Sequence, residues 1–245
     1  MEGGERRLRI LDLLIGSGDT TLCSRRLCEV CAQITGMSGA GIMLMSGDVP
    51  RGSLCSTNTV SDVIEQLQYM LGEGPCVDAY HQDWPVLEPD LANPESPRWP
   101  AFASQAVDAG ARAVFGFPLQ MGSVRLGALN LYRDHPGPLT DDQHADALVL
   151  ADLVAQSVLV LQASAQPGAL AAELEASADL QYGVHQASGM VSVQIGVSIG
   201  QAHIRLRAFA FSDGLPLAVV AESVISRTLR FAPTGDGRYS GQEGE

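Results

Sequence analysis

The chain has 245 residues, of which 46% are apolar, so it can bury the core of one large domain or of two modest ones. Its formal net charge of −13 argues against a generally basic nucleic-acid binder. The charge is uneven, because residues 1–165 hold ten Arg against twenty acidic residues, whereas residues 199–232 hold four Arg against two. A specific contact between the C-terminal part and RNA is compatible with this balance, and strong non-specific binding is not expected.

Apolar spacing, glycines and turn residues divide the first two thirds of the chain into short helices and strands. The predicted elements, in chain order, are helices over 8–36 with a break at 16–18, strands at 40–45 and 54–58, a helix over 60–71, a turn at 72–75, a helix over 99–109, and a hairpin of strands at 113–120 and 124–132. Helices that alternate with strands, some of them in hairpins, indicate an α+β domain.

A longer helix closes this region. Thr140 and Gln143 have the spacing of a capping box, and residues 147–161 are apolar almost all round. Such a helix must be buried on several sides, so we expect it to pack on its own sheet and against a second copy of the chain, giving a homodimer. Gln166-Pro167-Gly168 ends the helix and places the domain boundary between residues 165 and 166.

Three short amphipathic helices are predicted in the C-terminal part. The first covers 184–195, and the second begins after Ser198, which forms a capping-box pair with Gln201. Ser212-Asp213-Gly214 ends the second helix, and a third follows over 216–230. Short helices of this kind cover one another in a small bundle over 166–232, and residues 233–245 are predicted to be a disordered tail.

Three segments carry a resemblance to a known domain family. They are Gly72-Glu73-Gly74-Pro75-Cys76, Trp99-Pro100-Ala101-Phe102 and Leu126-Gly127-Ala128-Leu129-Asn130-Leu131-Tyr132. Over roughly residues 10–160 the chain resembles a GAF domain. The resemblance implies a small-molecule pocket near the Pro-rich loop that two Trp residues flank, although a loop pinned by two buried indoles is an equal alternative. The candidate pocket residues are Cys76, Tyr80, Trp84, Trp99 and Phe102.

The C-terminal helices resemble a second family. The residues that carry this likeness are Val184 to Gln194, Ala202, Leu206-Arg207, Ala210, Leu217, Val220-Ala221 and Leu229-Arg230-Phe231. They resemble the ANTAR domain, the three-helix RNA-binding module of bacterial transcription antiterminators, and the resemblance implies binding to hairpin loops of a leader transcript. The candidate RNA contacts are Gln186, Ser188, Gln194, Arg205, Arg207 and Arg227, with a solvated helix face as the alternative for the arginines.

The cysteines leave several interpretations open. Cys23, Cys28 and Cys31 have a spacing found in plant-type iron–sulfur sites, with Cys55 or Cys76 as a fourth ligand. On a predicted helix, however, their sulfurs spread around the circumference, so small buried hydrophobes are the favoured interpretation and a redox-responsive thiol is a second one. No nucleophilic triad, P-loop or paired metal-ligand spacing is found, so neither an enzyme nor a metal site is predicted, and the cofactor is left open.

The expected localisation rests on the absence of membrane-spanning and signal-peptide patterns from the sequence. No segment approaches the roughly 20 apolar residues that span a bilayer, and the first residues lack the apolar core of a signal peptide. We therefore expect a cytoplasmic protein without membrane contact, whose cysteines are reduced thiols rather than disulfides.

Together these patterns predict an α+β protein with an N-terminal GAF-like sheet-and-helix domain (1–165) that a helix joins to a C-terminal three-helix ANTAR bundle (166–232). The pairing resembles the sensor-plus-antiterminator regulators common in actinobacteria. It implies a transcription regulator that binds RNA hairpin loops and prevents termination under control of a sensed signal. The alternative is a ligand- or redox-sensing protein that acts through protein–protein contacts and uses its C-terminal bundle for dimerisation.

Overall fold

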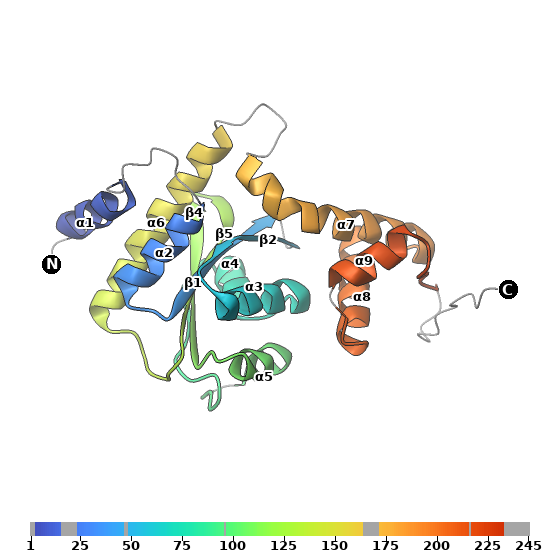
Figure 1. Ribbon diagram of the computed structural model, residues 1–245, viewed down its shortest axis with the longest axis horizontal. Coiled ribbons are helices and arrows are strands. Elements are labelled where there is room, and N and C mark those ends of the chain that lie inside the picture. Colours follow the sequence, from blue (N-terminus) through green and yellow to red (C-terminus); the bar gives the residue numbers. More distant parts are fainter. Residues whose placement is uncertain are drawn as a thin grey trace. The chain divides into compact units, whose positions relative to one another are not determined.

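The computed structural model of the chain describes residues 3–15, 24–46, 49–95, 97–163, 172–215 and 217–232. These residues form two compact units, 1–175 and 176–245, called here the N-terminal and the C-terminal unit (Figure 1). The elements, in chain order, are α1 (Gly3–Ile15), α2 (Ser24–Thr35), β1 (Gly39–Ser46), β2 (Val49–Ser56), α3 (Thr59–Leu71), α4 (Pro75–Gln82), β3 (Val86–Glu88), α5 (Pro100–Asp108), β4 (Ala113–Met121), β5 (Val124–Arg133), α6 (Asp141–Ala163), α7 (Ala172–Ile195), α8 (Ile199–Ser212) and α9 (Leu217–Ile225).

The N-terminal unit is built on an antiparallel sheet with the strand order β2-β1-β5-β4-β3. The predicted hairpin of β4 and β5 and the pairing of the two early strands are confirmed. The sequence patterns missed β3, because three residues are too few to show an alternation. Strands β1 and β5 approach very closely at Gly127, where a Cβ atom would lie 1.9 Å from the Met43 carbonyl oxygen.

Helices cover both faces of this sheet, as Figure 1 shows. Because side chains alternate along a strand, Ile42 and Leu129 pack with α2 and α6, whereas Met43 and Ala128 point to the opposite face beside α4. A further core cluster on this second face joins α3 to α5 through Ile64, among others. The result is a three-layer α+β domain with separate apolar cores on the two sides of the sheet.

The apolar segment at 147–161 forms most of helix α6, and part of it packs into the core of its own chain. Leu153 and Val158 are buried in the core that α6 shares with the sheet and α2, so they cannot form a seam between two chains. By length and hydropathy, Asp141–Gln162 could also cross a membrane, which corrects the expectation that no segment could. The core helix of a globular domain passes the same test, and 44% of this stretch is buried inside the chain.

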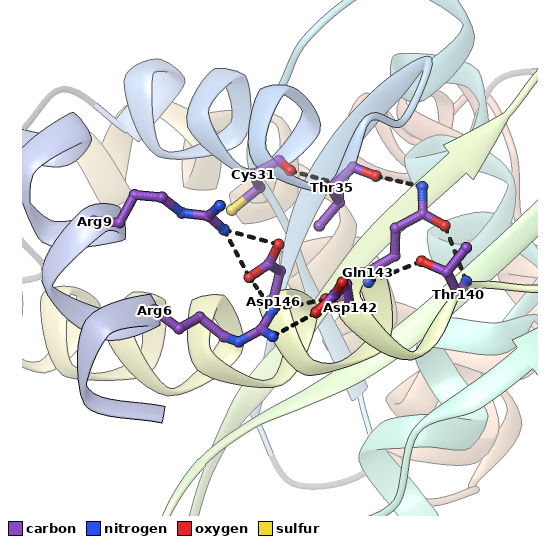
Figure 2. Close-up of polar contacts among 8 residues, drawn as sticks. All are labelled: Arg6, Arg9, Cys31, Thr35, Thr140, Asp142, Gln143 and Asp146. Carbon is purple, nitrogen blue, oxygen red and sulfur yellow. Dashed lines mark hydrogen bonds and ion pairs between the residues drawn. The ribbon is translucent and has the colours of Figure 1, made fainter. Parts of the chain in front are cut away.

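Polar contacts attach the neighbouring helices to the start of α6 (Figure 2). Arg6 of α1 forms ion pairs with Asp142, at 2.8 Å, and with Asp146. Gln143 donates from Nε2 to the Thr35 carbonyl at the end of α2, at 3.0 Å. The predicted capping box is confirmed as well, because Thr140 Oγ1 accepts from the Gln143 N–H and Gln143 Oε1 accepts from the Thr140 N–H. One turn of α6 thereby fixes both α1 and α2.

The C-terminal unit is a bundle of α7, α8 and α9 with its own core. Val184, Leu206 and Val220 represent the three helices in that core, and the predicted capping box of Ser198 and Gln201 is confirmed. Helix α7 begins twelve residues before the predicted start, at Ala172, and α9 ends earlier than predicted, at Ile225. The tail at 233–245 lies outside the described residues.

Candidate functional site

Four buried polar side chains meet between the sheet and the helices α3 and α4. Glu65 and Gln68 come from α3, Cys76 from the first turn of α4 and Asn130 from β5. Asn130 donates from Nδ2 to Glu65 Oε1 at 2.5 Å, and the Cys76 N–H donates to Gln68 Oε1 at 2.7 Å. We refer to these four residues as the buried polar cluster.

The buried polar cluster contains atoms that the protein's own groups leave unsatisfied. Among the described residues, Glu65 Oε2, Gln68 Nε2 and Asn130 Oδ1 are buried without a hydrogen-bond partner. Each unpaired buried polar atom costs about 1–3 kcal/mol, so three of them in one place require a reason. Together they offer one amide donor, one amide acceptor and a carboxyl oxygen to a molecule that could reach them.

The carboxyl group of Glu65 is kept neutral by its surroundings. Burial raises its pKa from 4.5 to about 8, and the nearby charge of Asp62 adds to this rise, while the hydrogen bond from Asn130 and the neighbouring Ser53 side chain oppose it. Burial and the proximity of Glu65 also raise the pKa of the Cys76 thiol well above its usual range. At neutral pH the cluster therefore holds a carboxylic acid and a thiol, and carries no charge.

Glycines make room for this arrangement. A Cβ atom on Gly41 would lie 2.4 Å from Glu65 Oε1, and one on Gly116 would lie 2.4 Å from the Pro75 carbonyl oxygen. Gly74, whose φ is +130°, leaves the space that the Gln68 side chain occupies. The small residues on the strands and before α4 thus let both helices approach the sheet closely enough to enclose the polar groups.

The structure brings together only some of the predicted pocket residues. Cys76 belongs to the buried polar cluster, and Tyr80 lies in the core beside it. Trp99 and Phe102 pack edge to face in a neighbouring core, where the Trp99 indole N–H donates to Asp78. Trp84 is 72% exposed, so the expectation that it lines a pocket with the others is wrong. It lies in the turn between α4 and β3.

A small hollow lies beside Trp99. Its volume is about 50 Å³, and its apolar lining includes Leu91, Pro97 and Ala103. The Arg98 guanidinium stacks 4.4 Å from the Trp99 ring centroid and covers one side. This hollow can hold a few atoms at most, so it suits a small apolar group rather than a whole metabolite.

Sequence patterns missed three of the four cluster residues. Glu65, Gln68 and Asn130 were not singled out, because charged and amide side chains on an amphipathic helix or a strand are usually solvated. One signal was available: Glu65 and Gln68 are three residues apart and directly follow the inward positions Ile64 and Leu67. A polar pair so close to the apolar stripe of a helix indicates a buried polar site.

The predicted RNA contacts have different surroundings. Gln186, Arg205 and Arg227 are exposed. Ser188 is fully buried, where its hydroxyl donates to the Val184 carbonyl at 2.7 Å and lies 3.2 Å from His203 Nδ1, so it is removed from the set of RNA contacts. Gln194 and Arg207 are only half-buried, and Gln194 Oε1 accepts the Phe231 N–H at 2.9 Å, which ties the segment after α9 to α7.

The cysteines contradict one expectation. Cys28 of α2 and Cys55 of β2 form a disulfide, whereas reduced thiols were predicted. Cys31 is a buried free thiol, which fits the interpretation of a small hydrophobe, and Cys23 lies outside the described residues. Within the part of the chain that is described, no three His, Cys, Asp or Glu side chains form a group that could hold a metal ion.

An antiparallel sheet between two helical layers, with a polar cluster enclosed under α3 and α4, defines a three-layer α+β domain. The model of the GAF domain family matches residues 21–158, more than half of the chain. The chain therefore belongs to the GAF domain family.

Some solved structures are similar to this chain at low sequence identity. A domain of a putative two-component sensor histidine kinase from Sinorhizobium meliloti is 18% identical, with a TM-score of 0.45, over 56% of this chain and 88% of that one. The GAF domain of a phosphoenolpyruvate-protein phosphotransferase from Coxiella burnetii is 12% identical, with a TM-score of 0.47, over 66% and 98%. The chromophore-binding domain of a Stigmatella aurantiaca bacteriophytochrome is 11% identical, with a TM-score of 0.46, over 64% and 60%. No curated protein gives a significant match.

Proposed function

We propose that this chain is a cytoplasmic, non-enzymatic regulator whose GAF domain binds a small uncharged molecule at the buried polar cluster. The three unsatisfied atoms of Glu65, Gln68 and Asn130 carry this proposal. Their chemistry favours a molecule that presents hydrogen-bond donors and acceptors side by side, such as the edge of an amide or of a nitrogen heterocycle. An anion fits poorly, because no cationic side chain belongs to the cluster and burial of an unpaired charge is costly.

The test is a thermal-shift screen of uncharged amides and nitrogen heterocycles, followed by calorimetric titration of any compound that stabilises the protein. The variants Gln68→Leu and Asn130→Leu remove one partner each, and we expect each to weaken binding at least tenfold. Trp84→Ala, at the exposed indole, is the matched control that should bind normally. Unchanged affinity in both cluster variants would show that the ligand binds elsewhere.

For the output, we propose that the C-terminal unit binds RNA hairpin loops and thereby prevents transcription termination. The resemblance to ANTAR domains and the exposed side chains of Gln186, Arg205 and Arg227 support this role. Loop bases are unstacked and readable, and Arg both pairs with phosphate and stacks on bases. The few cations predict a shallow dependence of affinity on salt.

A gel shift tests the output with a paired-hairpin RNA and a duplex of equal length. We expect the full chain to prefer the hairpin, and Arg205→Ala to weaken that binding by about 1–3 kcal/mol. Arg98→Ala, in the N-terminal unit, is the control that should leave binding unchanged. Equal binding to hairpin and duplex, or to neither, would contradict the proposal.

A second candidate for the output is protein–protein contact, including homodimerisation through the bundle. Large apolar side chains are exposed on all three of its helices, among them Val193 at 85%, Ile204, Phe211 and Val219. Exposed apolar surface of this kind is typical of interaction sites. Sedimentation at micromolar concentration separates the candidates: a dimer that Phe211→Ser splits, with no hairpin binding by the wild type, would favour this second function.

A further inference from the structure

The disulfide between Cys28 and Cys55 joins the helical layer to the edge of the sheet. Cys28 lies in α2, and Cys55 lies in β2, which is the terminal strand of the sheet. Their Cα atoms are 6.3 Å apart, within the range that a disulfide spans, and the bond closes a sequence separation of 27 residues. The bond therefore controls how tightly an edge strand, the least supported part of a sheet, is held.

A bulge in β2 carries this constraint through the sheet. Cys55 pairs with Ile42, and Ser53 pairs with Met43, so one extra residue lies between two neighbouring pairs. Because of this shift, Cys55 lies on the face of α2 and α6 with Ile42, whereas Ser53 lies on the face of α3 and α4 with Met43. Two nearby residues of one strand thus reach both helical layers.

Ser53 connects the bulge to the buried polar cluster. Its hydroxyl donates to the Cys55 carbonyl at 3.0 Å, and the same side chain lies near enough to Glu65 to lower the pKa of the carboxyl group. A displacement of Cys55 along β2 therefore moves Ser53, a polar neighbour of the carboxyl group. This short path links a thiol pair on one face of the sheet to the candidate sensing site on the other.

We propose that Cys28 and Cys55 are a reversible dithiol–disulfide switch that sets the position of β2 and, through Ser53, the polar surroundings of Glu65. The oxidant is a peroxide. One thiol is oxidised by hydrogen peroxide to a sulfenic acid, and one water leaves; the second thiol then attacks this sulfur, the S–S bond forms and a second water leaves. Two thiols thereby lose two electrons and two protons, and a reducing thiol returns them by exchange.

The accessibility of the two sulfurs suggests an order of events. Cys55 is 9% exposed and Cys28 is 0% exposed, so the peroxide reaches Cys55 first and Cys28 resolves the sulfenic acid. Cys31 lies one helical turn from Cys28, but burial raises its pKa to about 12. Cys31 is a free thiol beside the bonded pair, so it is not part of this bond. Only the effect on sensing rests on the proposed function; the thiol chemistry stands by itself.

The first experiment counts thiols in the full chain. The folded protein is treated with hydrogen peroxide or with dithiothreitol, denatured, alkylated and weighed. The chain has five cysteines, so we expect five alkylated thiols after reduction, three after oxidation, and a crosslinked pair of peptides that contain Cys28 and Cys55. Cys31→Ser should behave like the wild type with one thiol fewer, whereas Cys28→Ser should form no such crosslink. Five thiols after peroxide treatment, or a bond that dithiothreitol cannot reduce in the folded chain, would overturn the switch.

The second experiment measures the coupling. Infrared spectroscopy detects the carbonyl band of a protonated carboxylic acid, and the band of Glu65 is the one lost in Glu65→Gln. We expect reduction to shift this band in the wild type and in Cys31→Ser, but not in Cys28→Ser. A band that stays in place while the thiol count changes would refute the coupling. Failure to bind any small molecule, with the band shift intact, would count against the proposed function alone.

Discussion

The buried carboxyl group of Glu65 should make the stability of the N-terminal unit depend on pH. Its pKa is about 8 in the folded chain and near 4.5 when exposed, so between these values the folded chain holds a proton that the unfolded chain has released. The free energy of unfolding therefore falls as the pH rises through this window. The slope is about 1.4 kcal/mol per pH unit, and the total loss approaches about 5 kcal/mol above pH 8.

The substitution Glu65→Gln removes the titrating proton while it keeps an oxygen for the Asn130 amide. We expect its unfolding free energy to be nearly flat where that of the wild type falls. Urea unfolding followed by Trp fluorescence reports on this unit alone, because the two Trp residues of the chain, Trp84 and Trp99, both lie in it. Glu95→Gln, at an exposed loop residue, should keep the slope of the wild type. Parallel profiles for wild type and Glu65→Gln between about pH 5 and 8 would refute the reasoning.

Other parts of the chain give further predictions. Gly127→Ala places a Cβ atom against the Met43 carbonyl and should destabilise the N-terminal unit by about 3 kcal/mol or more in the same urea assay; a loss below about 1 kcal/mol would mean that the strands adjust easily. Burial, together with the nearby Arg207 and His185, lowers the pKa of His203 to about 3. At a pH between this value and the ordinary pKa of histidine, the unfolded bundle therefore binds a proton that the folded one does not. Helical circular dichroism should then show the C-terminal unit losing stability as the pH falls from about 6.5 toward 3, and His203→Gln should remove this dependence. Asp146→Asn takes one partner from Arg6 and should speed hydrogen exchange of the α1 amides while those of α3 stay protected; equal protection of α1 in both proteins would show that the ion pair does not hold this helix.

Local patterns were sufficient to predict most elements. The helix at α3, the hairpin of β4 and β5 and the capping boxes that begin at Thr140 and Ser198 all follow from residues close together in the chain. Backbone periodicity and capping hydrogen bonds act over three or four positions, so a short stretch of sequence contains all the information they need. The GAF resemblance was recognisable for a related reason, since the segments that carry it, such as Gly72 to Cys76, are each continuous in the chain.

The tertiary structure alone decided which polar and sulfur atoms meet. Asn130 reaches Glu65 across 65 positions of the chain, and Cys55 reaches Cys28 across 27, so no local pattern predicts either contact. Packing also reversed two expectations about exposure. The Trp84 indole, predicted to line a pocket, is at the surface, and Ser188, predicted to contact RNA, is buried in a core. Burial depends on which segments the fold lays over a residue. The charge state of Glu65, the pairing of Cys28 with Cys55 and the candidate sensing site therefore depend on how the helices pack on the sheet.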